Sequence, residues 1–251
     1  MKSIDKFSGK ADIYSKSRPS YPKGFLNFLI SANSLNESSK VADIGSGTGI
    51  LTRQLLERGL SVIAVEPNDD MRTAAEEDLN QFANFTSIKA TAEETTIPDK
   101  SVDLVIAAQA FHWFDHEKFK LECKRILRQE AKVALVWNSR TFTSPLIIEN
   151  AEICKEFCPN FYGFSGGIEE DQEVFKKFFR DGEYEFKRIS NDLTLDLGGF
   201  LGRNLSASYA PKPNDKEYQG FVEAVTDLFG KYSTNGKIVM PNFTQSYLGN
   251  V

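Results

Sequence analysis

The chain alternates short apolar runs with amphipathic segments over its first half. The run 102–108 (VDLVIAA) is almost continuously apolar, which is typical of a central parallel strand that is covered on both faces. Strands and helices that alternate in this way predict an α/β fold with a doubly wound, mostly parallel sheet. The other predicted strands lie at 40–45, 61–66, 86–90 and 132–137, and the predicted helices lie at 22–31, 48–58, 68–80 and 116–128.

A glycine-rich loop follows the first predicted strand, within residues 41–49 (VADIGSGTG). Gly45, Gly47 and Gly49 permit a positive φ and lack the Cβ atoms that would keep a ligand away from the backbone. The start of the next helix then directs free amide groups at that ligand, so the pattern predicts a cofactor loop. A dinucleotide fingerprint requires glycine at its sixth position, where this chain has Ile50, and the spacing therefore disfavours NAD and FAD.

An acidic residue ends the second predicted strand. Glu66 follows the apolar run 60–65, and a carboxylate at this place in a βαβ unit can accept both hydroxyl groups of a ribose. An ordinary solvated glutamate is the alternative interpretation.

The order of these motifs resembles that of the class I S-adenosylmethionine-dependent methyltransferases, over roughly residues 7 to 140. The family implies S-adenosylmethionine as cofactor and S-adenosylhomocysteine as product. It also implies a Rossmann-like, seven-stranded sheet with an antiparallel closing strand and a cap inserted in the C-terminal half. The cofactor-binding residues that the resemblance implies are Tyr14, Arg18, Asp43, Gly45, Gly47, Gly49, Glu66, Pro67, Met71, Ala92, Glu93 and Gln109.

Further motifs resemble the small-molecule branch that includes trans-aconitate methyltransferase-like proteins. They lie at Tyr14 with Arg18-Pro19, at 110–114 (AFHWF) and at 135–138 (LVWN). This resemblance implies a small-molecule acceptor, with a carboxylate oxygen as one candidate for the methylated atom, and an N-terminal flap that reaches the methionine carboxylate. A mobile, exposed N-terminus is the alternative for the flap. The substrate-binding residues implied are His112, Trp113, Asn138, Ser208 and Tyr209.

His112 is the candidate catalytic base, because an imidazole suits proton transfer near neutral pH. A hydroxyl or amine acceptor would use such a base, whereas a carboxylate acceptor needs none. A structural histidine is the alternative, and Trp113 beside it is either a core residue or part of an aromatic wall around a sulfonium. His116 is predicted to begin the next helix. The two histidines lack the matched ligands of a metal site, so no metal is predicted.

The alternation weakens beyond residue 140, where glycines interrupt aromatic-rich segments. This change predicts a substrate cap over 141–205, after a flap and helix over 1–35 and a cofactor-binding core over 36–140. A helix at 214–230 between strands at 184–189 and 237–247 resembles the closing elements of the family, and the predicted closing helix and strand span 206–251. Ser208 and Tyr209 resemble the part of the cap that faces substrate, and a plain surface turn is the alternative.

Composition narrows the range of functions. A length of 251 residues predicts one domain with insertions, and a formal net charge of −5 argues against a general nucleic-acid binder. The three cysteines lack the spacing of a zinc or redox motif. The absence of a signal-like start or a spanning apolar run predicts a cytoplasmic protein without membrane partners. A monomer or a homodimer is expected.

Two other functions are compatible with the sequence. A catalytically inactive S-adenosylmethionine-binding regulatory or interaction protein would share the fold, since fold alone does not establish activity. A methyltransferase that acts on RNA or protein is disfavoured by the acidic balance and by the lack of an appended binding module.

Overall fold

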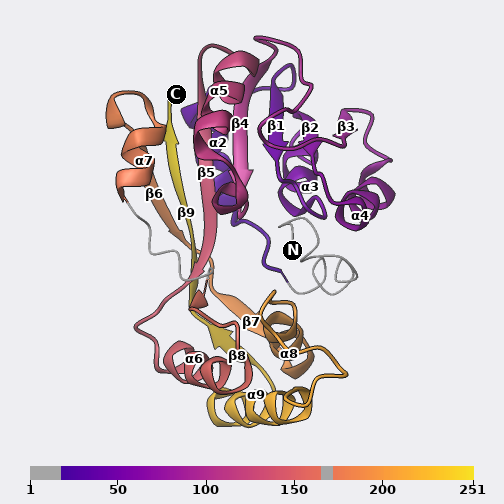
Figure 1. Cartoon of the computed structure of the whole chain (residues 1–251), viewed down its shortest axis with the longest axis vertical. Helices are drawn as coiled ribbons and strands as arrows, with labels where there is room; N and C mark the ends of the chain where they lie inside the picture. Colours follow the sequence, from indigo (N-terminus) through magenta and orange to yellow (C-terminus); the bar gives the residue numbers. More distant parts are fainter. Residues whose placement is uncertain (1–17, 165–171) are drawn as a thin grey trace.

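The computed structural model describes residues 18–164 and 172–251. Its centre is a seven-stranded sheet with the order β3-β2-β1-β4-β5-β9-β6 (Figure 1). The four pairs from β3 to β5 are parallel, and β9 is antiparallel to both of its neighbours, which confirms the predicted fold. The strands of this sheet are β1 Lys40–Ile44, β2 Ser61–Val65, β3 Phe85–Ile88, β4 Val102–Ala108, β5 Leu127–Arg140, β6 Glu185–Ser190 and β9 Asn242–Gly249.

The strand order reverses at β1, which has β2 on one side and β4 on the other. The loops that follow β1 and β4 therefore diverge to opposite faces of the sheet and leave a crevice at the carboxyl ends of the strands. This crevice is where the predicted glycine loop and the segment 110–114 meet.

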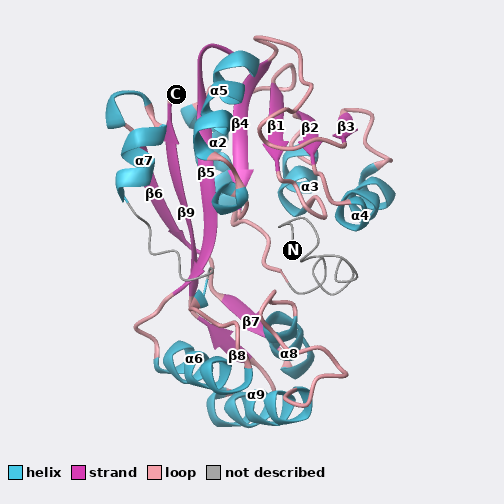
Figure 2. Ribbon diagram, in the orientation of Figure 1, coloured by secondary structure: helices cyan, strands magenta, loops and turns pink. Residues whose placement is uncertain are grey.

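Helices cover both faces of the sheet (Figure 2). Apolar residues of α2, α3 and α4 pack on one face, and those of α5 and α7 pack on the other. The alternation along β5 explains this division, because Val133 and Leu135 face α5 whereas Ala134 and Val136 face α2. These helices are α2 Lys23–Ala32, α3 Ile50–Leu56, α4 Asp69–Leu79, α5 His116–Ile126 and α7 Gln172–Phe178, and short 3-10 turns lie at Phe111–Trp113 and Arg180–Gly182.

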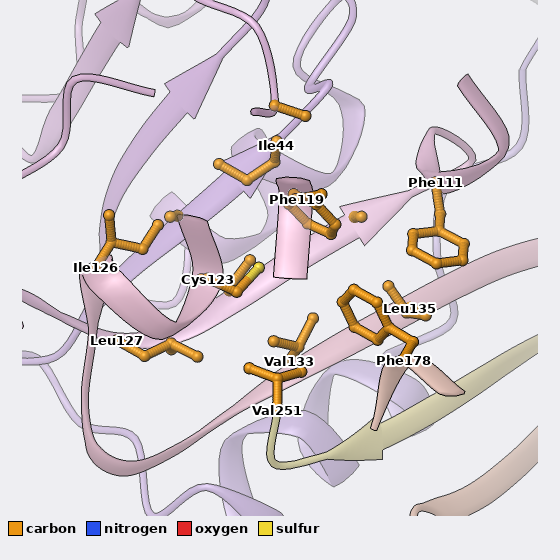
Figure 3. Packing of buried hydrophobic residues seen from close by; sticks show 14 of the residues in the cluster. Ile44, Phe111, Phe119, Cys123, Ile126, Leu127, Val133, Leu135, Phe178 and Val251 are labelled. Carbon is orange, nitrogen blue, oxygen red and sulfur yellow. The ribbon is translucent and has the colours of Figure 1, made fainter. Parts of the chain in front are cut away.

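Figure 3 shows the packing on the α5 face. Phe119 and Cys123 of α5 lie over Val133 and Leu135 of β5, and the Phe119 ring stacks on Phe178 of α7 at 5.7 Å between centroids. Cys123 is buried and free, and burial raises the pKa of its thiol, so it serves as a small apolar core residue.

A second lobe lies beyond the ends of β5 and β9 (Figure 1). It has an apolar core of its own, to which α6 contributes Leu146 and Ile147, α8 contributes Phe200 and α9 contributes Phe221. Its elements are α6 Pro145–Phe157, β7 Leu193–Leu195, α8 Leu197–Leu205, α9 Tyr218–Tyr232 and β8 Ile238–Met240. The range 141–205 predicted as the cap also contains α7 and β6, which pack with the main sheet.

The single strand predicted at 237–247 is wrong, because the chain forms two strands there. Pro241 separates β8, which pairs with β7, from β9, which closes the main sheet. A proline lacks an N–H to donate to a ladder, so it marks the point where the chain passes from one sheet to the other. The carbonyl of Pro241 still accepts the backbone N–H of Thr141, at 3.0 Å.

Helix α8 was not predicted, because three glycines in nine residues disfavour a helix. The Asp196 carboxylate compensates at the N-terminus, where it accepts the N–H of Gly199 at 2.8 Å. Complete burial of Phe200 in the second lobe then stabilises the helix through tertiary packing. In the described part of the chain, no helix is both long enough and apolar enough to cross a bilayer.

Candidate functional site

A cavity lies at the carboxyl ends of β1, β2 and β4 and extends to α8 of the second lobe, which contributes Arg203. Most of the predicted site residues meet here. Those that line the cavity are Arg18, Asp43, Gly45, Gly47, Glu66, Pro67, Met71, Gln109, Trp113 and Asn138.

The glycine loop forms one wall of the cavity, with positive φ at Gly45, Gly47 and Gly49. At Gly45 a Cβ atom would lie 2.6 Å from the Cβ of Ala110, so glycine is needed for close packing against the loop after β4. At Gly47 a Cβ would meet no atom within 4 Å, so this part of the loop faces open space. The loop thus exposes backbone that a ligand can approach.

Glu66 joins the end of β2 to this loop. Its Oε2 accepts the N–H of Gly47 at 2.9 Å, and its Oε1 accepts the N–H of Asn68 at 2.8 Å. Burial raises the pKa of Glu66, and the two backbone hydrogen bonds oppose that rise. Each carboxylate oxygen has a further lone pair, so Glu66 can accept two additional donors from the cavity.

Asp43 lies beneath the loop and is only 1% exposed. Its Oδ2 accepts the hydroxyl of Thr52 at 2.6 Å, whereas its Oδ1 has no hydrogen-bond partner among the described residues. Burial raises the pKa of Asp43 to about 6, and the nearby charge of Glu66 contributes to the rise. A buried carboxylate oxygen without a partner fits a ligand that brings a donor or a positive charge.

The loop after β4 forms the opposite wall. Gln109 adopts a positive φ of 59°, and its side-chain amide donates to the carbonyl of Asn138 at 2.9 Å. This hydrogen bond ties the ends of β4 and β5 together. The 3-10 turn that follows directs Trp113 and Phe114 toward the cavity, where they supply an aromatic surface.

Asn138 anchors the segment before α2 to this wall. Its Nδ2 donates to the carbonyl of Pro19 at 3.2 Å, and its Oδ1 accepts the hydroxyl of Thr244 at 2.5 Å and the amide of Asn191 at 3.2 Å. Arg18 begins that segment and donates to the carbonyl of Ser206 at 3.2 Å. The residues that precede α2 therefore bridge the main sheet and the second lobe.

The sequence of residues 42–135 matches the protein family described as methyltransferase domain. This range contains the glycine loop, Glu66 and the loop after β4. An uncharacterized methyltransferase of Mycobacterium tuberculosis is 40% identical over 134 residues, which cover 53% of this chain. Another, from Staphylococcus carnosus, is 34% identical over 190 residues, which cover 70% of this chain and 81% of that protein. The chain belongs to the class I S-adenosylmethionine-dependent methyltransferases.

The similarity to known methyltransferases differs in extent between sequence and structure. The chain spans about half the length of the mycobacterial relative, with 52% of that protein covered. A solved structure assigned as a type II methyltransferase of Anaeromyxobacter dehalogenans superposes with a TM-score of 0.66 and covers 93% of this chain and 97% of that one. Its sequence identity is 20%, so the likeness shows the fold alone.

Several predicted site residues of this methyltransferase do not line the cavity. Gly49 caps α3 and packs toward Leu79, where a Cβ would lie 2.7 Å away. Ala92 is buried in the core, and Glu93 accepts the N–H of Asp115 at 2.9 Å. The adenine contacts that the resemblance implies for Ala92 and Glu93 stay predictions.

The histidines have different surroundings. His112 is half-buried, and its ring lies 4.7 Å from that of Trp113. His116 begins α5, as predicted, and stacks on Phe111 at 4.1 Å between centroids. Among the described residues, no group of three or more histidine, cysteine, aspartate or glutamate side chains could hold a metal ion.

The other predicted substrate residues lie on the second lobe. Ser208 is exposed, whereas Tyr209 packs edge-to-face on Phe161 at 4.9 Å between centroids. Tyr14 lies outside the described residues. Arg203 lines the cavity but was not predicted, because the glycine-rich sequence of α8 gave no indication of a helix. The one feature of the sequence that could have indicated Arg203 is its spacing of three residues from Phe200, which places both on one face of a helix.

Proposed function

We propose that the protein transfers the methyl group of S-adenosylmethionine to a small-molecule acceptor, with a carboxylate oxygen as the methylated atom. The observation that carries the proposal is a cavity in which the glycine loop and Glu66 lie at one side and Trp113, Asn138 and Arg203 lie at the other. Such a cavity can hold a cofactor and a small acceptor side by side. Family membership supports the choice of cofactor.

The residues of the cofactor side fit S-adenosylmethionine. Glu66 would accept the ribose hydroxyls, because each of its carboxylate oxygens retains a free lone pair. The Oδ1 atom of Asp43, which has no partner among the described residues, would accept a donor from the methionine portion. Gly47 leaves open space for the approach of the cofactor. Arg18, which lines the cavity, would reach the methionine carboxylate. The same role for Tyr14 stays a prediction from the family resemblance.

Positioning is the main catalytic contribution that we propose for this chain. Bound S-adenosylmethionine supplies an electrophilic methyl group on a sulfonium. Well-oriented reactants gain effective molarities on the order of 10⁵–10⁸ M, so alignment alone can account for much of the rate. Trp113 and Phe114 would exclude water and stabilise positive charge at the sulfonium through their ring faces.

A carboxylate acceptor requires no proton removal by the protein. This requirement agrees with the place of His112, whose ring packs beside Trp113 rather than lining the cavity. A hydroxyl or an amine acceptor would need a general base, and the role of His112 as that base stays a prediction, because its ring does not line the cavity.

The proposal is tested with labelled S-adenosylmethionine and a cell extract that has been separated into small-molecule and macromolecular fractions. We expect label in the small-molecule fraction, in a product that mild base hydrolyses as a methyl ester. Label only in RNA or protein would contradict the small-molecule acceptor. Cofactor binding without label in either fraction would identify a cofactor-binding regulatory or interaction protein instead.

A further inference from the structure

A second polar site lies where β5 and β9 leave the main sheet for the second lobe. Arg140 follows Asn138 by two residues on β5, so the two side chains project from the same face of the strand. Asn242 pairs with Arg140 across the β5–β9 ladder and shares this face. Asn138 lines the cavity, and Arg140 and Asn242 lie next along the same face of the sheet, beyond the residues that line it.

Arg140 is a buried cation, with only 6% of its surface exposed. Its guanidinium lies 3.9 Å from the centre of the Phe164 ring. In the described ranges 18–164 and 172–251, no carboxylate forms an ion pair with it, and its Nε has no hydrogen-bond partner. An arginine remains protonated in proteins, so this site holds positive charge that these residues do not neutralise.

The polar groups beside Arg140 do not supply a negative charge. The pKa of Tyr209 is raised by burial, and the pKa of Cys154 is raised by its hydrogen bond with Cys158 and by burial. Both groups are therefore neutral at pH 7. Burial lowers the pKa of Arg140 itself, and the charge of Arg18 adds to this effect, so a further cation lies close by.

Buried amides near Arg140 also lack partners among the described residues. Both side-chain atoms of Asn242 and the Nδ2 of Asn150 make no hydrogen bond there, although each residue is at most 1% exposed. Asn150 lies one helical turn before Cys154, whose thiol donates to its Oδ1 at 3.9 Å. Unsatisfied buried donors are rare in folded proteins, and a bound ligand or ordered solvent is one way to satisfy them.

We propose that Arg140, Asn242 and Asn150 form a subsite for an anionic oxygen group of the methyl acceptor, remote from the atom that receives the methyl group. A carboxylate or a phosphate would pair with the guanidinium and accept hydrogen bonds from the two amides. The charge of Arg203, which lines the cavity, opposes the rise in the pKa of Tyr209, as the charge of Arg140 does, so both arginines lie close to Tyr209. The inference rests on the proposed methyl transfer, because it assigns this subsite to the acceptor.

Calorimetric titration of the full chain, saturated with S-adenosylhomocysteine, tests the subsite. The probes are succinate, inorganic phosphate and the uncharged succinamide. We expect saturable binding of succinate or phosphate but not of succinamide, and the anion that binds identifies the preferred group. Arg140→Gln should weaken the binding about ten- to hundredfold, because it removes charged hydrogen bonds. The affinity for S-adenosylhomocysteine should stay the same.

Arg128→Gln is the matched control, because Arg128 lies at the other end of β5 and pairs with Asp103. It should leave anion binding unchanged. Equal anion binding by wild type and Arg140→Gln would overturn the subsite, as would equal binding of succinamide and succinate or a lack of binding by both anions. The succinate titration is repeated without S-adenosylhomocysteine. If the chain binds succinate but does not bind S-adenosylhomocysteine, the proposed function is refuted and the anion subsite still stands.

A stability measurement gives an independent test that does not require a ligand. If Arg140 is retained for an acceptor, its uncompensated charge destabilises the free protein, and Arg140→Met should raise the melting temperature. A fall in the melting temperature, beyond that of Arg128→Gln, would show that Arg140 is held for packing on Phe164 and would contradict the proposal.

Discussion

At the scale of single residues, Asp43 combines burial with an incomplete set of hydrogen bonds. Its pKa is raised from 3.8 to about 6, first by burial and also by the charge of Glu66. Between these two values the folded chain binds more protons than the unfolded chain. The contribution of Asp43 to stability is therefore present at low pH and is lost as the pH rises through about 6.

Asp43→Asn should remove this dependence on pH. The amide oxygen can still accept the hydroxyl of Thr52, but it carries no charge to bury. We expect the free energy of unfolding of the variant to exceed that of wild type by on the order of 3 kcal/mol at pH 7, and the difference to vanish near pH 4. Urea unfolding across this range measures it. A constant difference between the two proteins would contradict the raised pKa.

Glu66 is expected to contribute to binding more than to folding. Glu66→Ala removes the proposed acceptor of the two ribose hydroxyls and the hydrogen bond that holds Gly47. We expect the affinity for S-adenosylmethionine to fall about ten- to hundredfold, while the chain stays folded by circular dichroism. Glu57→Ala, at the exposed end of α3, is the control. Unchanged affinity of Glu66→Ala would exclude the ribose role.

At the scale of elements, two glycines of the loop between β1 and α3 differ in what they are needed for: Gly45 for packing and Gly47 for ligand access. Gly45→Ala adds a Cβ that would lie 2.6 Å from Ala110, so we expect a marked loss of stability. Gly47→Ala adds a Cβ to open space and should cost only about 1–2 kcal/mol for its positive φ, yet weaken cofactor binding. Thermal unfolding and titration of both variants test this order. Equal losses of stability would contradict it.

The same scale explains which elements the sequence predicts well. Strands β1, β2 and β4 lie within one residue of their predicted ranges, because each is a short apolar run covered on both faces. Strand β5 continues to Arg140, beyond the predicted end at 137, because its last residues pair with β9 from the far end of the chain. A local pattern does not contain that long-range partner.

The site divides in a similar way. The glycine loop and Glu66 belong to one βαβ unit, so their spacing predicts their meeting in the cavity. Arg140 and Arg203 come from segments that converge only when β5, β9 and α8 assemble. Nothing in the nearby sequence marks their function, and their burial as charged residues becomes visible only in the fold.

At the scale of the whole molecule, the cavity lies between two lobes with separate apolar cores. The main sheet supplies the geometry of the proposed cofactor site, because its strand order creates the crevice. The second lobe adds Arg203 and the surroundings of Arg140. Under the proposed function, the sheet binds the cofactor and the lobe junction selects the acceptor.

The most direct test of the central claim is calorimetric titration of the purified chain with S-adenosylmethionine and S-adenosylhomocysteine, with NAD as comparison. We predict saturable binding of the two adenosyl ligands at one site and no binding of NAD. We also predict that Glu66→Ala binds the adenosyl ligands more weakly than wild type. A folded chain that binds neither adenosyl ligand, or that binds NAD with equal affinity, would contradict the account.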